Sequence, residues 1–510
     1  MPSRLSFLDA SFLQLEASSA NAHMHIGGVL IFAGRAPGYD DFCAVIARRI
    51  HLVPRYRQRL QFVPSGIANP QWVDDPHFRL ERHVHAAALP IPGTEAQLVD
   101  LVSRIFSERL HRDRPLWELW LVEGLDKDRF GLVSKMHHCL SDGISGVDIA
   151  TLILDLDQTP PDATDPPQAW RARPLPSATE TLGAAVAENV RRSMKAVRTA
   201  TSLARQPHEW APTMRTARSA AVQLGRAIRG QAPPSPYNVH IGAGRRFTWV
   251  HASLSDVKAI NTALGGTLND VVLAAVAGAM HGNLHRLGSR AGRLDLMAMV
   301  PVNLRTEAER RTLGNRLALM YVPLPVRDRD AISRLRRVRK TMRSFKEGDQ
   351  VAGIELLSSI GNLLPPRLVS GLARLAGSAR VFNVTVTNIP GPQFPLYLLG
   401  RELRRLVPMV PVTDKHAVGI AAMSYNGWVS FGLLGDDVVM EDIEELAGDL
   451  CSALTELAEA AGTAMPSLEL PPARVEAPRQ VAGRKTDVIP MPLGSGSPRG
   501  LSGRGAGRAR

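Results

Sequence analysis

Cysteine is scarce in this chain of 510 residues, and its three cysteines (Cys43, Cys139 and Cys451) form no CxxC pair. So few thiols exclude a disulfide framework and indicate a reducing, intracellular compartment. A membrane-spanning helix needs about 18–20 apolar residues in a row, and the longest apolar run, residues 271–280, is far shorter. The N-terminus has no basic region followed by an apolar stretch, so no secretory signal is expected.

Several nucleotide, metal and hydrolase motifs are also missing from the sequence. It contains no GxSxG, which argues against a serine hydrolase of the nucleophile-elbow type. It contains no Walker loop, no GxGxxG and no pair of ligands at the usual metal spacings. We therefore expect neither a metal site nor a bound cofactor.

The net charge of +13 is unevenly distributed. Residues 161–230 carry eleven Arg or Lys against five acids, and residues 473–510 carry eight against two. The rest of the chain is nearly neutral. This distribution argues against a nucleic-acid-binding core and favours basic segments that touch an anionic surface.

A chain of this length exceeds one typical domain, and its pattern predicts two α/β (α+β) units. We expect residues 1–157 to form the first unit and residues 236–470 the second. Between them, residues 158–235 begin with a Pro-rich linker and continue as a basic, partly helical connector. The tail, residues 471–510, is dense in Gly, Pro, Ser and Arg, so we expect it to be disordered.

The connector contains two helical patterns with a thin apolar stripe and a basic flank. The first stripe has Leu182, Val186, Val190, Met194 and Val197, and the second has Met214, Ala217, Ala221, Leu224 and Ile228. Such helices often lie in a membrane interface. The alternative is that they pack on their own domains and leave the basic side in water.

Hydrophobic periodicity predicts the following regular elements. Helices are expected at 40–50, 97–110, 255–264 and 438–460, and also from near Ser145 and from Thr267, the predicted N-cap of its helix. Strands are expected at 23–32, 114–124, 130–136, 247–254, 294–303, 317–324, 381–389, 418–425 and 429–434.

The stretch Met136–Gly143, read as MHHCLSDG, follows the predicted strand 130–136. Side chains alternate along a strand, so Met136 and His138 point to one side and His137 to the other. The two histidines therefore cannot easily converge on one metal ion. An imidazole at a strand end, followed by Asp and Gly, suits a single general base with a nearby carboxylate and a tight turn. The alternative is that both histidines are ordinary core or rim residues.

A histidine base without a protein nucleophile beside it can deprotonate a bound alcohol or amine. The substrate then attacks directly, and no covalent enzyme intermediate forms. The pattern thus favours direct group transfer.

The segment HHCLSDG resembles the HHxxxDG signature of the superfamily that includes chloramphenicol-acetyltransferase-like enzymes and peptide-synthetase condensation domains. Further motifs resemble those of the bacterial wax ester synthase/diacylglycerol acyltransferase family, in order, over roughly residues 4–460. They are Arg114-Pro-Leu-Trp-Glu118, Asn269-Asp-Val-Val272, Pro301-Val-Asn-Leu-Arg305, Gly314-Asn-Arg316 and Asn388-Ile-Pro-Gly-Pro392, where Thr387 replaces the usual Ser.

The resemblance implies two chloramphenicol-acetyltransferase-like domains with a central substrate tunnel. Long-chain acyl-CoA would enter from one side and a hydrophobic alcohol from the other. The same resemblance implies that His138 takes the hydroxyl proton, that the oxygen attacks the thioester carbonyl, and that CoA leaves.

Roles for the other site residues also follow from the resemblance. His137 is supportive, Gly143 permits the turn, and Asp142 orients the loop through an ion pair. The partner of Asp142 stays open among Arg55, Arg57 and Arg59. Asn269 polarises the thioester or holds the alcohol, and its alternative role is to cap its helix.

The implied function is an acyl-CoA-dependent esterification of diacylglycerol, which is triacylglycerol synthesis in lipid and glycerol metabolism. A wax ester synthase that uses long-chain fatty alcohols is the alternative, since both acceptors need similar apolar tunnels. A condensation-type acyltransferase and a non-catalytic lipid-droplet-binding protein are less favoured. We expect a cytoplasmic protein, peripherally associated with membrane or lipid droplets, that does not bind nucleic acid.

Overall fold

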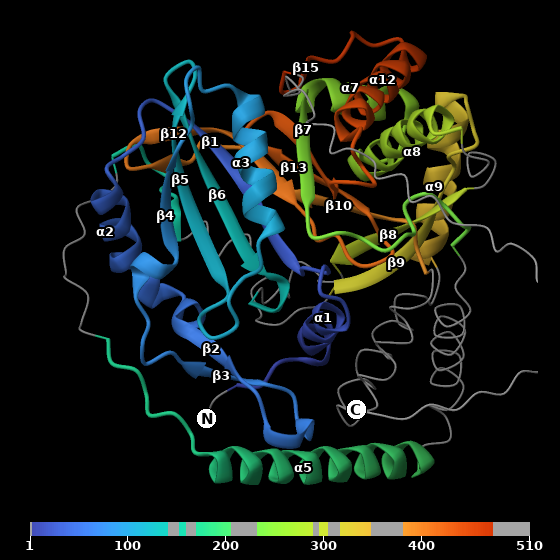
Figure 1. Cartoon of the computed structure of the whole chain (residues 1–510). Coiled ribbons are helices and arrows are strands. Elements are labelled where there is room, and N and C mark those ends of the chain that lie inside the picture. Colours follow the sequence, from blue (N-terminus) through green and yellow to red (C-terminus); the bar gives the residue numbers. More distant parts are fainter. Residues whose placement is uncertain are drawn as a thin grey trace, which may run out of the picture. The chain divides into compact units, whose positions relative to one another are not determined.

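The chain is mixed α/β, as predicted. The computed structural model (Figure 1) describes residues 3–140, 152–159, 170–205, 232–288, 295–303, 317–347 and 381–472. All of these belong to one compact unit, Met1–Ala473. The described residues form a six-stranded sheet, a seven-stranded sheet and a small two-stranded sheet, with helices against the larger two.

The first sheet has the strand order β11-β12-β1-β6-β5-β4. In that order its strands are Tyr397–Leu398, Arg401–Met409, His25–Ala33, Arg129–His137, Trp117–Leu125 and Val84–Ala88. Only the pair of β4 and β5 is parallel. At the centre, β1 pairs with β6 from His25 opposite His137 to Ala33 opposite Arg129.

Helices cover both faces of the first sheet. On one face, α1 (Phe7–Ser18) and α2 (Tyr39–Arg49) share a core with the inner residues of β1, β5 and β6. On the other face lies α3 (Glu95–Ser107), which begins with a capping box between Thr94 and Gln97. The N-terminal half of the chain also contains a small sheet of β2 (Gln58–Gln61) and β3 (Gln71–Asp74). Its 3-10 turns are Ile50–Leu52, Pro54–Arg57, Pro64–Gly66, Leu80–Arg82 and His138–Leu140.

The second sheet has the order β15-β7-β14-β13-β10-β8-β9. In that order its strands are Leu468–Glu469, Arg245–Ser253, Trp428–Asp436, Val418–Tyr425, Val384–Pro390, Leu296–Asn303 and Leu317–Leu324. One face packs on α7 (Leu254–Leu264), α8 (Leu268–Arg286), α9 (Ala331–Glu347) and α12 (Ile443–Ala461), which lie together in Figure 1. Within α8, Val271–Ala277 are fully buried, as expected of a helix that is apolar on all sides.

A shared core joins the two sheets. Strand β12 pairs with β1 of the first sheet and also packs on β13 and β14 of the second. Helix α3 contacts β7, where the Phe247 amide donates to Ser103 Oγ (3.1 Å) and the Arg245 amide donates to Ser107 Oγ (2.8 Å). The first sheet is therefore completed by a strand from the C-terminal part of the chain.

Most predicted elements are confirmed, and two of them, β9 and β13, have the predicted bounds. Strand β6 ends at His137, so the turn begins at His138 rather than after it. Helix α12 begins at Ile443, five residues later than predicted. Helices α1 and α9 and strand β12 were not predicted, and the helix expected from Ser145 lies outside the described residues. The predicted division of the chain into four segments stays a prediction.

The first connector helix is α5 (Ala178–Arg205), whose inner face contacts the N-terminal half. Ala185 packs with Val63 and Ala68, and Asn189 Nδ2 donates to the Ile67 carbonyl oxygen (2.9 Å). The second predicted connector stripe lies outside the described residues. Among the helices described, none is by itself long and apolar enough to cross a bilayer; only the bent pair of α7 and α8 reaches that length and composition together.

The junction of the two sheets gives a stability prediction. A Cβ atom on Gly432 of β14 would overlap the Pro408 carbonyl oxygen of β12. We expect Gly432→Ala to lower the free energy of unfolding by about 1–3 kcal/mol, because the two strands must move apart. Urea denaturation measures this change.

The matched control is Gly448→Ala in α12, where a Cβ would meet no atom within 4 Å. Since alanine favours a helix more than glycine, this variant should gain up to about 1 kcal/mol. Equal stabilities of the two variants would contradict the prediction.

Candidate active site

The two adjacent histidines are held by different neighbours at the end of β6. The His137 amide donates to the Leu116 carbonyl oxygen (3.0 Å), next to β5. The His138 amide donates to the Met24 carbonyl oxygen (2.8 Å), next to β1. Their side chains consequently have different surroundings: His137 is buried and His138 is partly exposed. The prediction that they do not converge on one point agrees with this arrangement.

The His137 ring has a hydrogen bond at one nitrogen and, within the described part of the chain, only a charged neighbour at the other. Its Nδ1 accepts a hydrogen bond from the Cys139 amide (3.1 Å), so the ring proton belongs on Nε2. Nε2 lies 3.4 Å from Glu16 Oε2, and Glu16 also forms a close ion pair with Arg112. Burial alone would raise the pKa of Glu16, but its interactions with His137 and with the Arg112 guanidinium outweigh burial and lower this pKa to about 2. Glu16 is therefore a carboxylate at neutral pH.

The His138 ring contacts Phe12, with 4.1 Å between ring centroids. Burial lowers the pKa of His138 to about 4; its own backbone carbonyl opposes this shift and the nearby His137 adds to it. His138 is thus neutral at pH 7 and can accept a proton. Among the described residues, nothing forms a hydrogen bond of ordinary geometry with its buried Nδ1, which favours Nε2 as the nitrogen for a substrate.

Helix α1 supplies a neighbour to each histidine, Phe12 to His138 and Glu16 to His137, and the sequence analysis missed this helix. Phe12 and Glu16 are four residues apart, so they lie on one face of α1. A signal for the helix was present: Ser6 caps it by accepting from the Asp9 amide (3.1 Å), and Asp9 follows at the spacing of a capping box.

The Arg-Pro-Leu-Trp-Glu motif supports the end of β6. Trp117 is fully buried, its Nε1 donates to the Tyr56 carbonyl oxygen (2.8 Å), and its ring stacks on His83 at 4.7 Å. Leu116 accepts the His137 amide, as described above. The motif therefore anchors the strand that pairs with the histidine strand.

A buried polar group lies behind His137. The fully buried Lys135 donates through Nζ to the carbonyl oxygens of Ile105 (2.8 Å) and Glu108 (2.7 Å), at the C-terminal end of α3. His25 sits opposite His137, and burial together with the Lys135 charge places the pKa of His25 well below its usual value. Lys135 and His137 share the face of β6 that the alternation predicted.

Asn269 lies at the start of α8 but does not cap it. The cap is made by Thr267 and Asp270, as a capping box. Instead, Asn388 Nδ2 donates to Asn269 Oδ1 (3.5 Å), which brings the Asn-Asp-Val-Val and Asn-Ile-Pro-Gly-Pro motifs together. Among the described residues, no hydrogen bond joins Asn269 to His137 or His138. Thr387, beside Asn388, is buried in β10.

Asp142, Gly143 and Arg305 lie outside the described residues, so the roles given to Asp142 and Gly143 stay predictions. Which of the three arginines partners Asp142 stays open, and among the described residues each has a neighbour. The guanidinium of Arg55 lies 4.7 Å from the Trp72 ring and that of Arg57 lies 4.6 Å from the Trp170 ring. Arg59 Nε is 4.0 Å from Asp75 Oδ1.

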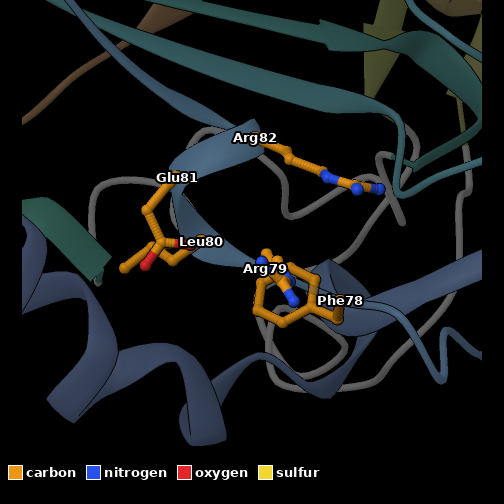
Figure 2. Close-up of a pocket in the computed structure, with 5 residues that line it drawn as sticks. All are labelled: Phe78, Arg79, Leu80, Glu81 and Arg82. Atoms are coloured by element: carbon orange, nitrogen blue, oxygen red, sulfur yellow. The ribbon is translucent and has the colours of Figure 1, made fainter.

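Two surface hollows of the described structure contain none of the predicted site residues. One, of about 600 Å³, is lined by Phe78–Arg82 (Figure 2). The other, of about 400 Å³, lies between α8 and α12. Within the described ranges, no group of three or more His, Cys, Asp or Glu residues could hold a metal ion.

Buried neutral histidines predict a loss of stability in mild acid. Burial lowers the pKa of His23, His83 and His416 to about 4 and that of His251 to about 3. Between pH 6.5 and 4 the unfolded chain binds more protons than the folded one, so stability falls as pH falls. Each histidine should contribute a loss of about 1.4 kcal/mol per pH unit. Glu16 acts in the same direction, but only below its unfolded pKa of 4.5.

Urea denaturation at neutral pH and at about pH 5 measures this loss. The control is His251→Gln, which removes one titrating group and should make the pH dependence shallower by about one proton. A free energy of unfolding that is the same at both pH values would contradict the prediction.

Two family models match most of the chain. The wax ester synthase/diacylglycerol acyltransferase catalytic domain matches residues 5–272, and the WS/DGAT C-terminal domain matches residues 313–458. The chain is 32% identical over 466 residues to "Probable diacyglycerol O-acyltransferase tgs1" of Mycobacterium tuberculosis, covering 89% of this chain and 95% of the relative. It is 30% identical over 461 residues to "Probable diacyglycerol O-acyltransferase tgs2" of the same species, covering 89% and 98%.

Solved structures agree with these matches. The wax ester synthase/diacylglycerol acyltransferase from Marinobacter aquaeolei VT8 is similar with a TM-score of 0.64 and 27% identity, over 90% of this chain and 100% of that one. The starter condensation domain of rhizomide synthetase is similar in fold alone, with a TM-score of 0.57 and 12% identity over 91% and 95%. The chain therefore belongs to the wax ester synthase/diacylglycerol acyltransferase family, as its motifs predicted.

Proposed function

We propose that this acyltransferase transfers the acyl group of a long-chain acyl-CoA to the free hydroxyl of diacylglycerol. The observation that carries the proposal is His138, a neutral and partly exposed imidazole at the end of β6. The names of the mycobacterial relatives support diacylglycerol as the acceptor. The Marinobacter structure, named for both activities, supports a long-chain alcohol as a second acceptor.

In the proposed reaction, His138 Nε2 accepts the proton of the acceptor hydroxyl. The oxygen attacks the thioester carbonyl and forms a tetrahedral intermediate. When the intermediate collapses, the C–S bond breaks, the ester remains, and the thiolate of CoA takes the proton from His138. We infer that the reaction needs no cofactor.

The remaining site residues enter as part of the proposal. His137 supports the base, Asp142 orients the loop that follows, and Gly143 permits its turn. Asn269, paired with Asn388 and not used as a helix cap, is available to hold the thioester or the alcohol. The central tunnel would bring both substrates to His138.

The test is thiol release from palmitoyl-CoA in the presence of dioleoylglycerol or hexadecanol, with the lipid product identified. We expect His138→Ala to lower the rate about 10²–10⁴-fold, because the reaction loses its positioned base.

His51→Ala, which removes an exposed histidine after α2, is the control and should keep the wild-type rate. Equal rates in wild type and His138→Ala would exclude His138 as the base. Lipid binding without any thiol release would instead favour the non-catalytic lipid-droplet protein.

We also infer that the enzyme works at an anionic lipid surface and that α5 touches it. Leu182, Val186, Val190 and Met194 are 42%, 50%, 52% and 52% exposed, although they form one apolar stripe. The helix uses a different face, with Ala185 and Asn189, to contact the body. The exposed Arg191 and Arg198 lie beside the stripe on its other side. Apolar burial and basic charge together are typical of interfacial helices.

Vesicle flotation tests this surface. We expect Val186→Asp combined with Val190→Asp to weaken binding to phosphatidylcholine/phosphatidylglycerol vesicles at least about 10-fold, since two apolar side chains become charged. Omitting phosphatidylglycerol should weaken binding of the wild type as well.

The control is Val438→Asp, which charges a valine that is 74% exposed but lies outside α5. Unchanged binding by the double variant would exclude α5 as the contact surface.

A further inference from the structure

We propose that Glu16 is a positioning residue for the base. Glu16 fixes the orientation of the His137 ring. The His137 ring then holds the 3-10 turn that carries His138. The proposal rests on the proposed function and adds a helix, α1, to the machinery of the same site.

A continuous chain of contacts leads from Glu16 to the base. Glu16 Oε2 lies 3.4 Å from His137 Nε2, and His137 Nδ1 accepts the Cys139 amide at 3.1 Å. Cys139 directly follows His138 in the 3-10 turn. The carboxylate thus reaches the backbone of the turn through one imidazole.

The charge of Glu16 selects the tautomer of His137. A carboxylate only accepts hydrogen bonds, so it favours the ring with its proton on Nε2. That tautomer leaves Nδ1 free to accept the Cys139 amide. With a neutral amide in place of Glu16, the opposite tautomer becomes possible, and its Nδ1–H would face the Cys139 N–H. The turn would then lose a hydrogen bond and change its conformation.

The surrounding charges support an orienting role for Glu16. Arg112 pairs with its carboxylate, and His25 Nε2 lies 4.0 Å from it. His25 accepts from the Leu110 amide at 3.4 Å through the same nitrogen, so it does not donate to Glu16 in that tautomer. The Glu16 side chain is only 4% exposed. Because the Glu16 carboxylate is paired with Arg112 and buried, it cannot itself reach a substrate.

Helix α1 makes a second, direct contact with the base through Phe12. Its C-terminal end is tied down by Arg109, whose Nη2 donates to the carbonyl oxygens of Glu16 (3.3 Å) and Ser19 (3.1 Å). Phe12 and Glu16 therefore form one rigid face that holds both histidines.

The first test compares kcat and KM for the isosteric variant Glu16→Gln. We expect kcat to fall about 10- to 100-fold, the range for residues that orient a catalytic group, while KM for palmitoyl-CoA stays the same.

The matched control is Glu95→Gln. Glu95 pairs with Arg129 (2.6 Å) at the other end of the same strand β6, so this change removes an ion pair without touching the histidines. Its kcat should be that of the wild type. A wild-type kcat in Glu16→Gln would overturn the proposal.

A second measurement needs no turnover: carbethoxylation by diethyl pyrocarbonate, mapped by mass spectrometry. His137 is 1% exposed and should be unreactive in the wild type and in Glu95→Gln. In Glu16→Gln the loosened turn should make His137 reactive. An unreactive His137 in that variant would overturn the proposal. If the labelling is as expected but no protein consumes acyl-CoA, the positioning holds and the proposed function fails.

A second pair of variants keeps the test valid if Glu16→Gln does not fold. The amide oxygen of His137→Asn can reach the position of Nδ1 and accept the Cys139 amide, whereas His137→Leu cannot. We expect the asparagine variant to retain about 10-fold more kcat than the leucine variant. Equal losses in the two variants would overturn the role of the Cys139 contact.

Discussion

Strand β1 is the backbone element on which the rest of the structure depends. It pairs with β6 along one edge and with β12 along the other, so Val29 lies between Val133 and Val407. The pairing is close: a Cβ on Gly27 would overlap the Ser134 carbonyl oxygen. Met24, the residue before β1, accepts the hydrogen bond of the His138 amide. The register of β1 therefore fixes where His138 lies along the direction of the strands. Strand β1 thus joins the two halves of the protein and determines where His138 lies.

The site separates two adjacent histidines by burial. Both lie at the end of β6. His137 faces the buried carboxylate of Glu16, whereas His138 contacts the Phe12 ring and is partly exposed to solvent. A buried imidazole without an anionic partner stays neutral, because burial penalises the charged form. The partly enclosed His138 ring has no anionic neighbour among the described residues, so it is neutral and can accept a proton without first losing one. His137, beside Glu16, keeps its proton on the far nitrogen and serves the backbone instead.

Sequence patterns predicted features that depend on neighbouring residues, and they missed contacts between segments far apart in the chain. Alternation placed His137 and His138 on different sides, and Thr267 was identified as a cap from its own neighbours. Glu16 was missed because its contacts with His137 and Arg112 join segments far apart in the chain, and no periodicity reports such pairs. Strand β12 was missed because Arg401, Arg404 and Arg405 interrupt its apolar pattern. Arg404 is exposed, whereas Arg405 packs over Trp428 and pairs with Glu469. The motif Pro-Leu-Trp was noted only as a resemblance, and its anchoring of β6 required coordinates.

The late position of β12 in the chain has a consequence for biosynthesis. Translation releases β1 early, but its partner on one edge is among the last strands to be made. At cellular rates of synthesis the interval is on the order of tens of seconds. During that time β1 presents an unpaired edge, which other nascent chains can join. The central strand of the first sheet therefore lacks one of its two neighbours until the ribosome has passed Met409.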